Sequence, residues 1–143
     1  MNKINIAIVG ATGLVGRTFL KVIDEYKIPV GKLKLFASKR SLGKDVVFQD
    51  KVYKIEVIQP GSFKDIDYAL FSAGASTSIA YADQVVSEGA IVIDNSSAFR
   101  MNKNIPLVVP EINLKDAIGK SLIANPNCST IQSVLPLQAL KQY

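Results

Sequence analysis

The chain has 143 residues, of which 48% are hydrophobic and 20% are charged, proportions typical of a soluble globular domain with a sizeable core. Its 17 basic and 12 acidic residues give a net charge of +5, but the basic residues are scattered, which favours anionic small molecules over nucleic acid as partners. The single cysteine excludes an internal disulfide, and no apolar run reaches membrane-spanning length. We therefore expect a cytoplasmic protein without a signal peptide or membrane contact. The chain contains no histidine.

The first segment, residues 4–16, predicts a strand, a glycine turn and a helix in that order. Residues 4–9 are a continuous β-rich apolar run, as in a strand buried on both faces of a parallel sheet. The turn spaces Gly10, Gly13 and Gly16 three apart, one residue longer than the usual dinucleotide-binding pattern. We expect Gly10 to permit the tight turn, Gly13 to let a pyrophosphate approach the backbone, and Gly16 to let the helix pack on the strand. A plain strand–helix turn is the alternative.

The helix after this turn is expected to bury one face, formed by Val15, Phe19, Val22, Ile23 and Tyr26. A second strand follows at residues 33–37. In NAD-specific folds an acidic residue near the end of this strand holds the ribose hydroxyl, whereas here the chain continues Ser38-Lys39-Arg40-Ser41. Hydroxyl groups and a guanidinium suit a 2′-phosphate, so the sequence favours NADP over NAD. A solvated basic turn is the alternative.

The middle of the chain alternates strands and helices. Residues 44–60 carry short alternating runs that predict either a small antiparallel excursion or a continuation of the sheet. A core strand at 67–71 and another at 90–94 flank a helix. Ser76, Thr77 or Ser78 can cap this helix, Ile79, Ala82 and Val86 share one of its faces, and Gly89 ends it. This alternation predicts an α/β fold of Rossmann type, with a doubly wound, mostly parallel sheet and helices on both faces. The loops after the strands should then meet at one edge of the sheet as a common binding site.

The loop after the strand at 90–94 places polar donors at this edge. It contains Asn95, two serines and Arg100, which suit a phosphate or a carboxylate, although such residues are also common turn formers. A short helix that Asn113 can cap and Gly119 can end follows, before a strand at 122–124.

Cys128 stands where the last helix is expected to begin. A helix N-terminus favours the thiolate that a covalent nucleophile needs, whereas a lone cysteine can also be a small buried hydrophobic residue. The segment 130–143 carries helical apolar spacing, but Pro136 predicts a bent or broken helix.

Six motifs, in order along the chain, resemble the aspartate-semialdehyde dehydrogenase family. They lie at residues 10–16, 38–43, 72–76, 94–100, 109–113 and 125–130. The last motif, Asn-Pro-Asn-Cys-Ser-Thr, is highly specific. By this resemblance, Cys128 would be the nucleophile that forms the acyl intermediate, and Asn95 and Arg100 would hold the substrate phosphate. The residues implied for the NADP cofactor are Gly10, Thr12, Gly13, Leu14, Val15, Gly16, Ser38, Arg40, Ser41, Ser72, Ala73 and Gly74.

The family reduces aspartyl phosphate to aspartate semialdehyde, for the synthesis of lysine, threonine and methionine. The resemblance therefore implies an oxidoreductase with small-molecule substrates, a cysteine thioacyl intermediate, NADPH as hydride donor, and a homo-oligomer for the complete enzyme. No metal site is predicted.

The resemblance covers only the first domain of the family. We expect residues 1–128 to form the NADP-binding domain and residues 129–143 to begin a helix leading into a missing catalytic and dimerisation domain. The family's acid/base histidine would lie beyond Tyr143, so this chain is expected to be inactive alone. One alternative is N-acetyl-glutamyl-phosphate reductase, which usually has Gly and Tyr around its cysteine where this chain has Asn127 and Ser129. The other is a non-catalytic NADP-binding module, which would need no reactive thiol.

Overall fold

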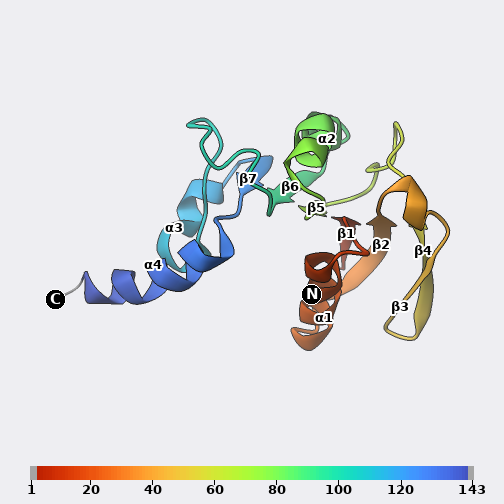
Figure 1. Ribbon diagram of the computed structural model, residues 1–143, viewed down its shortest axis with the longest axis horizontal. Coiled ribbons are helices and arrows are strands. Elements are labelled where there is room, and N and C mark those ends of the chain that lie inside the picture. Colours follow the sequence, from red (N-terminus) through yellow and green to blue (C-terminus); the bar gives the residue numbers. More distant parts are fainter. Residues whose placement is uncertain (1–2, 142–143) are drawn as a thin grey trace.

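The computed structural model describes residues 3–141, which form one sheet flanked by helices (Figure 1). The strands are β1 (Ile4–Val9), β2 (Val30–Phe36), β3 (Asp45–Phe48), β4 (Lys51–Glu56), β5 (Tyr68–Phe71), β6 (Ile91–Asp94) and β7 (Leu122–Ala124). The helices are α1 (Leu14–Glu25), α2 (Ala75–Ser87), α3 (Pro110–Asn113) and α4 (Cys128–Leu140), with short 3-10 turns at Lys39–Ser41 and Leu114–Ala117.

The sheet has the order β3-β4-β2-β1-β5-β6-β7, and every neighbouring pair is parallel except β3 with β4. From the central β1 the chain builds outward to β2 and β4 on one side, then returns to build β5, β6 and β7 on the other. This is the doubly wound arrangement, and the predicted fold class is confirmed. Residues 44–60 combine both predicted alternatives, because β3 and β4 form an antiparallel hairpin while β4 extends the sheet by pairing with β2.

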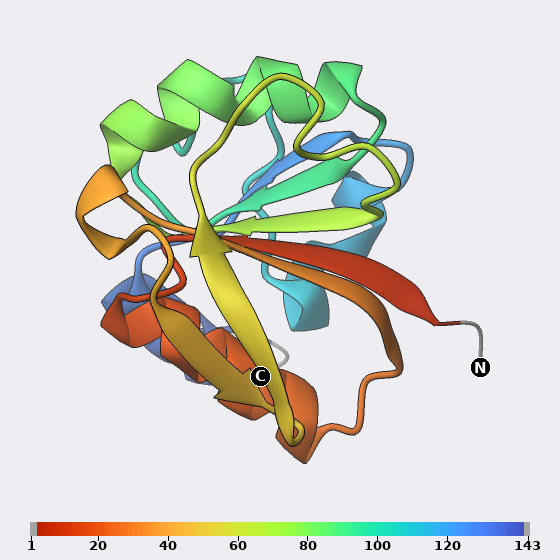
Figure 2. The same cartoon turned by 90° about the vertical axis from the view of Figure 1, so that its right-hand side faces the viewer.

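Strand β1 is buried on both faces, as its continuous apolar run predicts. Ile8 packs in one core with Ile23 of α1, whereas its neighbour Val9 packs in a second core with Val85 of α2. Figures 1 and 2 show α1 and α2 on opposite faces of the sheet. Side chains alternate across a strand, so a strand covered on both faces is apolar at every position.

Helix α1 buries only part of the predicted stripe: Ile23 is buried and Phe19 packs partly buried against the same core, as predicted. Its buried residues are Gly16, Leu20 and Ile23, whereas Val22 and Tyr26 are 40% and 77% exposed. The cause is Gly16, where the helix lies so close to the glycine turn that a Cβ would overlap its backbone. With Gly16 turned inward, Leu20 and Ile23 follow at helical spacing, and Val22 and Tyr26 rotate toward solvent.

Helix α2 is not capped by any of the three predicted hydroxyl groups. Its N-cap is Gly74, with φ of 88°, and Ser76 is exposed. Thr77 and Ser78 instead donate hydrogen bonds to the carbonyl groups of Ala73 and Gly74, at 3.1 and 3.3 Å. These hydroxyls therefore bond backward to carbonyls one turn earlier, which is the usual alternative for Ser and Thr inside a helix.

The buried face of α2 agrees with the prediction at Ala82 and at the partly buried Val86, but not at Ile79. Ser78, Ala82 and Val85 are buried, whereas Ile79 is 64% exposed. The Ser78 hydroxyl donates to the carboxylate of Asp94 at 2.7 Å, and both side chains are fully buried. This contact fixes the rotation of the helix and turns the adjacent Ile79 outward.

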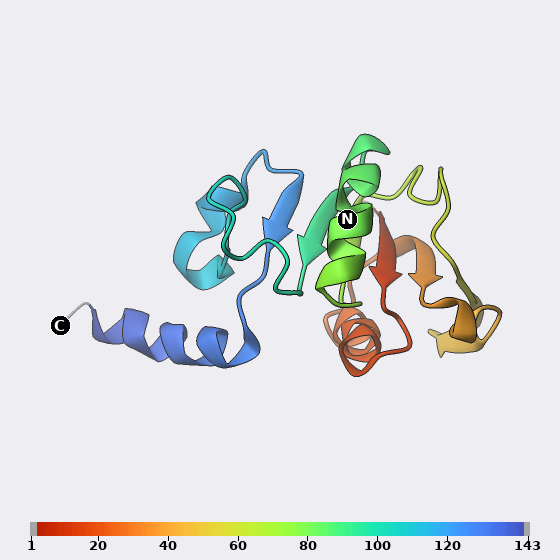
Figure 3. The ribbon, with the colours of Figure 1, turned by 45° about the horizontal axis from the view of Figure 1, so that its top comes forward.

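The later helices correct one further prediction and qualify another. Asn113 ends α3 and stands at the N-cap of the 3-10 turn Leu114–Ala117, as predicted, but its side chain makes no capping bond to that turn. Its Oδ1 instead accepts a hydrogen bond from the N–H of Val109 at 2.8 Å. Helix α4 runs unbroken through Pro136. Pro136 and Gln132, whose carbonyl loses its donor, are both exposed, so water can satisfy that carbonyl. No residue of α4 is buried, and Figure 3 shows the helix extending away from β7.

Within residues 3–141, no helix combines the length and apolar character needed to cross a membrane.

Candidate functional site

The glycine turn between β1 and α1 is held against the ends of β2 and β5. The N–H groups of Gly10 and Ala11 both donate to the carbonyl of Phe36, at 2.8 and 3.0 Å. Gly10 has φ of 94°, and a Cβ there would lie 2.7 Å from the carbonyl carbon of Ser72. Backbone conformation and lack of space therefore both require glycine at this position.

Gly13 is the N-cap of α1, so no side chain caps the first turn of this helix. Its own N–H donates to the carbonyl of Gly10 at 3.0 Å. The first-turn N–H groups and the positive end of the helix dipole together favour an anion. Arg17, which the sequence analysis missed, donates from Nε and Nη2 to the carbonyl of Thr12 at 3.2 and 2.9 Å. Arg17 thus stabilises the turn through these hydrogen bonds and adds positive charge beside it.

Two adjoining cavities lie at the carboxyl ends of β1, β2 and β5. The smaller measures about 290 Å³ and the larger about 540 Å³, and they share Ala37, Ser38, Ile58 and Thr77. Among residues 3–141, no acidic side chain lines either cavity. Parallel sheets bind ligands in such crevices outside the carboxyl ends of their strands.

The structure brings part of the predicted cofactor set together. The predicted residues that line the smaller cavity are Gly10, Thr12, Gly13, Ser38, Ser72 and Ala73. Lys39, which was not in the predicted set, lines the larger cavity, whereas Arg40 is exposed and lines neither, and Ser41 is buried. Leu14, Val15 and Gly16 lie in the first turn of α1 and Gly74 caps α2, outside both cavity linings.

Asp94, at the end of β6, holds the loop that follows this strand through hydrogen bonds. Its carboxylate accepts hydrogen bonds from the Ser78 hydroxyl at 2.7 Å, the Ser96 hydroxyl at 2.7 Å and the Ser96 N–H at 3.1 Å. The Ser96 hydroxyl in turn accepts from the N–H of Ala98 at 3.1 Å. This buried carboxylate therefore ties the loop after β6 to helix α2, and the sequence analysis did not single it out.

Arg100 joins the loops that follow β6 and β7. Its Nη2 donates to the carbonyl of Asn95 and its Nε to the carbonyl of Asn125, both at 3.0 Å. The side-chain amide of Asn125 also donates to Oδ1 of Asn95, at 2.6 Å. Asn95 and Arg100 are thus brought together as predicted by the resemblance, with Asn125 as a third polar member. Each is partly buried, and charges interact more strongly at such a position than at an exposed one.

Cys128 is the first residue of α4 and is exposed. The preceding Asn127 caps the helix, since its Oδ1 accepts from the N–H of Ser129 at 2.9 Å. Of the two interpretations of this cysteine, the small buried hydrophobic residue is therefore wrong. The turn that presents Cys128 also contains Asn125, which contacts both Asn95 and Arg100.

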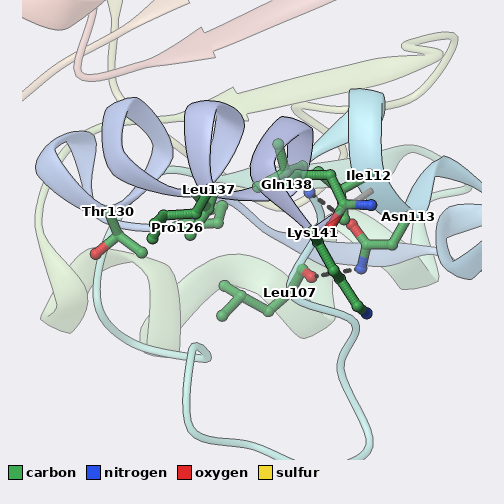
Figure 4. A pocket seen from close by; sticks show the side chains of 10 residues that line it. Leu107, Ile112, Asn113, Pro126, Thr130, Leu137, Gln138 and Lys141 are labelled. Carbon is green, nitrogen blue, oxygen red and sulfur yellow. Dashed lines mark hydrogen bonds between the residues drawn. The ribbon is translucent and has the colours of Figure 1, made fainter. Parts of the chain in front are cut away.

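A separate apolar groove of about 460 Å³ lies between α4 and the segment 107–113 (Figure 4). Leu107 and Ile112 line one side, and Leu137 of α4 lines the other. None of the predicted cofactor, phosphate or nucleophile residues lines this groove.

Comparisons with known proteins agree with this arrangement. Residues 5–121 match the family model described as semialdehyde dehydrogenase, NAD binding domain. Aspartate-semialdehyde dehydrogenase of Aquifex aeolicus is 55% identical over 139 residues, a match that spans 94% of this chain but 41% of that protein.

Two solved structures carry the comparison further. The crystal structure of aspartate semialdehyde dehydrogenase II from Vibrio cholerae, complexed with ASA, superposes with a TM-score of 0.92 at 42% identity, over 99% of this chain and 47% of that chain. The Candida albicans aspartate semialdehyde dehydrogenase with NADP gives a TM-score of 0.77 at 27% identity, over 99% and 47%. The chain thus spans less than half the length of these relatives. Because the family model covers most of the sequence, the chain belongs to the semialdehyde dehydrogenase family, and residues 5–121 are its domain for a nicotinamide dinucleotide.

Proposed function

We propose that this chain is the nucleotide-binding part of an NADP-dependent aspartate-semialdehyde dehydrogenase. The observation that carries the proposal is the position of Cys128, exposed at the N-terminus of α4, on a turn bonded to Asn95 and Arg100. A domain that only binds a nucleotide has no use for a nucleophile beside an anion site.

The residues at the sheet edge fit a phosphorylated dinucleotide. At Gly13 an added Cβ would lie 3.3 Å from the carbonyl oxygen of Gly10, a tight contact, so glycine suits a backbone that a pyrophosphate approaches closely. We assign the pyrophosphate to Gly10, Thr12 and Gly13 and to the first turn of α1 at Leu14, Val15 and Gly16. Ser72, Ala73 and Gly74 would line the nicotinamide half.

The larger cavity favours NADP over NAD. Ser38 and Lys39 line it, Arg40 lies next in sequence, and no acidic side chain is present to repel a 2′-phosphate or to bind a ribose hydroxyl. Ser38, Lys39 and Arg40 are therefore proposed to hold the 2′-phosphate. Ser41, also implied by the resemblance, would support this turn from its buried position, since its N–H donates to the carbonyl of Ser38 at 2.8 Å.

The proposed chemistry uses Cys128 twice. Its thiolate attacks the carbonyl carbon of aspartyl phosphate, the bond from that carbon to the phosphate oxygen breaks, and inorganic phosphate leaves toward Asn95 and Arg100. The cofactor, when bound, supplies the hydride that reduces the thioester. Expulsion of the thiolate then releases aspartate semialdehyde and restores Cys128. Arg100 is suited to its role because its guanidinium carries a permanent positive charge in a fixed plane.

The rest of the active site is proposed to come from residues outside this chain, since residues 1–143 contain no histidine for proton transfer. General acid–base catalysis contributes about 10²–10⁴ in rate, so we expect the 143-residue chain to bind nucleotide without measurable turnover.

The test is an assay of NADP reduction with aspartate semialdehyde and phosphate, on this chain and on a longer chain carrying the natural continuation of its sequence. We expect activity only in the longer chain, and a loss of at least about 10³-fold in its Cys128→Ser variant. Ser133→Ala, an exposed serine on the same helix, is the matched control. N-acetylglutamate semialdehyde, as comparison substrate, tests the sister enzyme. Equal turnover by both chains, or an active Cys128→Ser variant, would contradict the proposal.

A further inference from the structure

The connection from β4 to β5 contains no helix, although parallel strands in this class of fold are ordinarily joined by one. The segment 57–63 nevertheless forms part of the nucleotide cavities. Ile58 lines both of them, and Val57, Gln59 and Pro60 line the larger one. The segment closes one turn of its own, in which the N–H of Ser62 donates to the carbonyl of Gln59 at 3.0 Å and the N–H of Gln59 donates to the Ser62 hydroxyl at 2.9 Å. Its position relative to α2 depends on contacts from outside this turn.

Glu88, the C-cap residue of α2, supplies two of these contacts. Its Oε1 accepts from the N–H of Gly61 at 2.8 Å, and its Oε2 accepts from the N–H of Phe63 at 2.6 Å. Gln84, one turn earlier, donates from Nε2 to the carbonyl of Gln59 at 2.8 Å and to Oε1 of Glu88 at 2.7 Å. Figure 2 shows the segment arching beside α2 before it enters β5.

The same stripe of α2 serves the cavity and the segment. Thr77 and Tyr81 line the larger cavity, and Gln84 and Glu88 follow them at helical spacing toward the C-terminus. One helix face therefore borders the ligand space at one end and holds the cavity wall at the other.

The hydrogen bonds of Glu88 stabilise its charged carboxylate against two unfavourable effects, the helix dipole and partial burial. A carboxylate at a helix C-terminus is disfavoured by the helix dipole. Partial burial also works to raise its pKa, but the hydrogen bonds from the Gln84 side chain and from the backbone of Phe63 and Gly61, together with the positive charge of Lys64, lower the pKa of Glu88 overall. The charged form is thus stabilised by the segment that it holds.

The segment is also linked to the glycine turn indirectly, through Phe36 at the end of β2. Phe63 is fully buried, and its ring centroid lies 5.0 Å from that of Phe36. The carbonyl of Phe36 accepts the N–H groups of Gly10 and Ala11. A displacement of residues 61–63 would therefore reach both the cavity wall and the glycine turn.

We propose that Gln84 and Glu88 are positioning residues of the nucleotide site, which hold the segment 57–63 as the wall against which the adenosine half of the dinucleotide binds. The inference rests on the proposed function, and it adds residues that touch neither the cofactor nor the substrate.

The experiment measures the affinity of the 143-residue chain and its Glu88→Gln variant for NADPH and for 2′,5′-ADP by titration calorimetry. An amide cannot accept both N–H groups as the carboxylate does, so we expect both ligands to bind about tenfold more weakly. Ile23→Val, a core substitution on the opposite face of the sheet, is the control for a general loss of stability. It should lower the melting temperature and leave both affinities unchanged.

Amide hydrogen exchange without nucleotide tests whether Glu88 holds the segment, separately from its effect on nucleotide affinity. We expect the Gly61 and Phe63 amides to exchange faster in Glu88→Gln than in the unmodified chain, while β1 amides keep their rates. A folded Glu88→Gln variant with unchanged affinities would overturn the positioning role, and unchanged exchange at Gly61 and Phe63 would overturn the contact itself. If the unmodified chain binds neither ligand, the proposed function fails, and the exchange rates still decide whether Glu88 holds the segment.

Discussion

Two carboxylates, Asp94 and Glu88, hold loops in this domain through hydrogen bonds to neutral donors. Neither takes part in the ion pairs found within residues 3–141, which join exposed side chains within α1, between β2 and Asp65, and between β3 and β4. Exposed pairs of that kind contribute little to stability, whereas a carboxylate bonded to backbone N–H groups is a stronger interaction. Single acidic residues therefore fix the loop after β6 and the segment that precedes β5.

The lowered pKa of Glu88 predicts a pH-dependent contribution to stability. Its ordinary value is 4.5, so the unfolded chain binds this proton more readily than the folded chain. The stabilisation is complete above that value and is lost as the pH falls through the lowered pKa of the folded chain. We expect Glu88→Gln to reduce the free energy of unfolding by about 1–2 kcal/mol at neutral pH, and the difference to shrink in acid.

Urea denaturation of both proteins, from neutral pH into the acid range, measures this difference. Glu25→Gln, which removes an exposed carboxylate that pairs with Lys21, is the matched control and should change stability by no more than about 0.5 kcal/mol. A Glu88 difference that stays constant with pH would contradict the assignment.

For single residues, the sequence predicts a role well where that role depends on residues nearby along the chain. The spacing of Gly10, Gly13 and Gly16 predicts the tight turn and the close packing of α1, because the turn and this helix are contiguous in the sequence. Arg17 and Glu88 gave no signal, since their partners are backbone groups. Glu88 reaches an N–H 25 residues away along the chain, and no side-chain pattern marks such a contact.

At the scale of elements, α2 shows how one buried contact overrides local preference. Ser76 and Ser78 are the same residue type, and the sequence predicts either of them as a cap of α2. Ser78 donates to buried Asp94, whereas Ser76 is exposed. We expect Ser78→Ala to reduce the free energy of unfolding by about 1–3 kcal/mol, because the buried carboxylate loses its hydroxyl donor at 2.7 Å and Oδ1 keeps the Ser96 N–H at 3.1 Å.

Ser76→Ala is the matched control, and we expect a change within about 0.5 kcal/mol. Thermal denaturation of the two variants decides between the two interpretations of this helix start. A larger loss for Ser76→Ala than for Ser78→Ala would mean that Ser76 caps α2 after all.

The order and type of the elements could be predicted because buried parallel strands and amphipathic helices have distinct periodicities. Which face each helix buries could not be predicted with the same success. In α1 the close approach at Gly16 decides the rotation, and in α2 the bond from Ser78 to Asp94 decides it. Both are contacts between elements, and apolar spacing within one helix does not contain them.

At the scale of the whole molecule, α4 packs loosely on the rest of the domain. None of its residues is buried, Leu137 and Leu140 are 61% and 65% exposed, and the apolar groove of Figure 4 runs beside it. Apolar surface of this kind promotes association. We expect the 143-residue chain to self-associate as its concentration rises, and the double variant Leu137→Lys, Leu140→Lys to remain monomeric.

Sedimentation velocity over a concentration series tests this expectation. Ile79→Lys is the control, because Ile79 is 64% exposed on α2, outside the groove lining. It should associate as the unmodified chain does. An unmodified chain that stays monomeric throughout, or an Ile79→Lys variant that alone abolishes association, would contradict the assignment to α4.

We propose that this domain binds NADP at the carboxyl ends of β1, β2 and β5. The direct measurement is a titration of the 143-residue chain with NADPH and NADH at fixed ionic strength. We predict saturable binding with NADPH preferred by at least about tenfold, a preference that falls in Lys39→Ala and Arg40→Ala and weakens as salt is added. Equal affinities for the two nucleotides, a preference that both substitutions leave intact, or no binding of either would contradict the account.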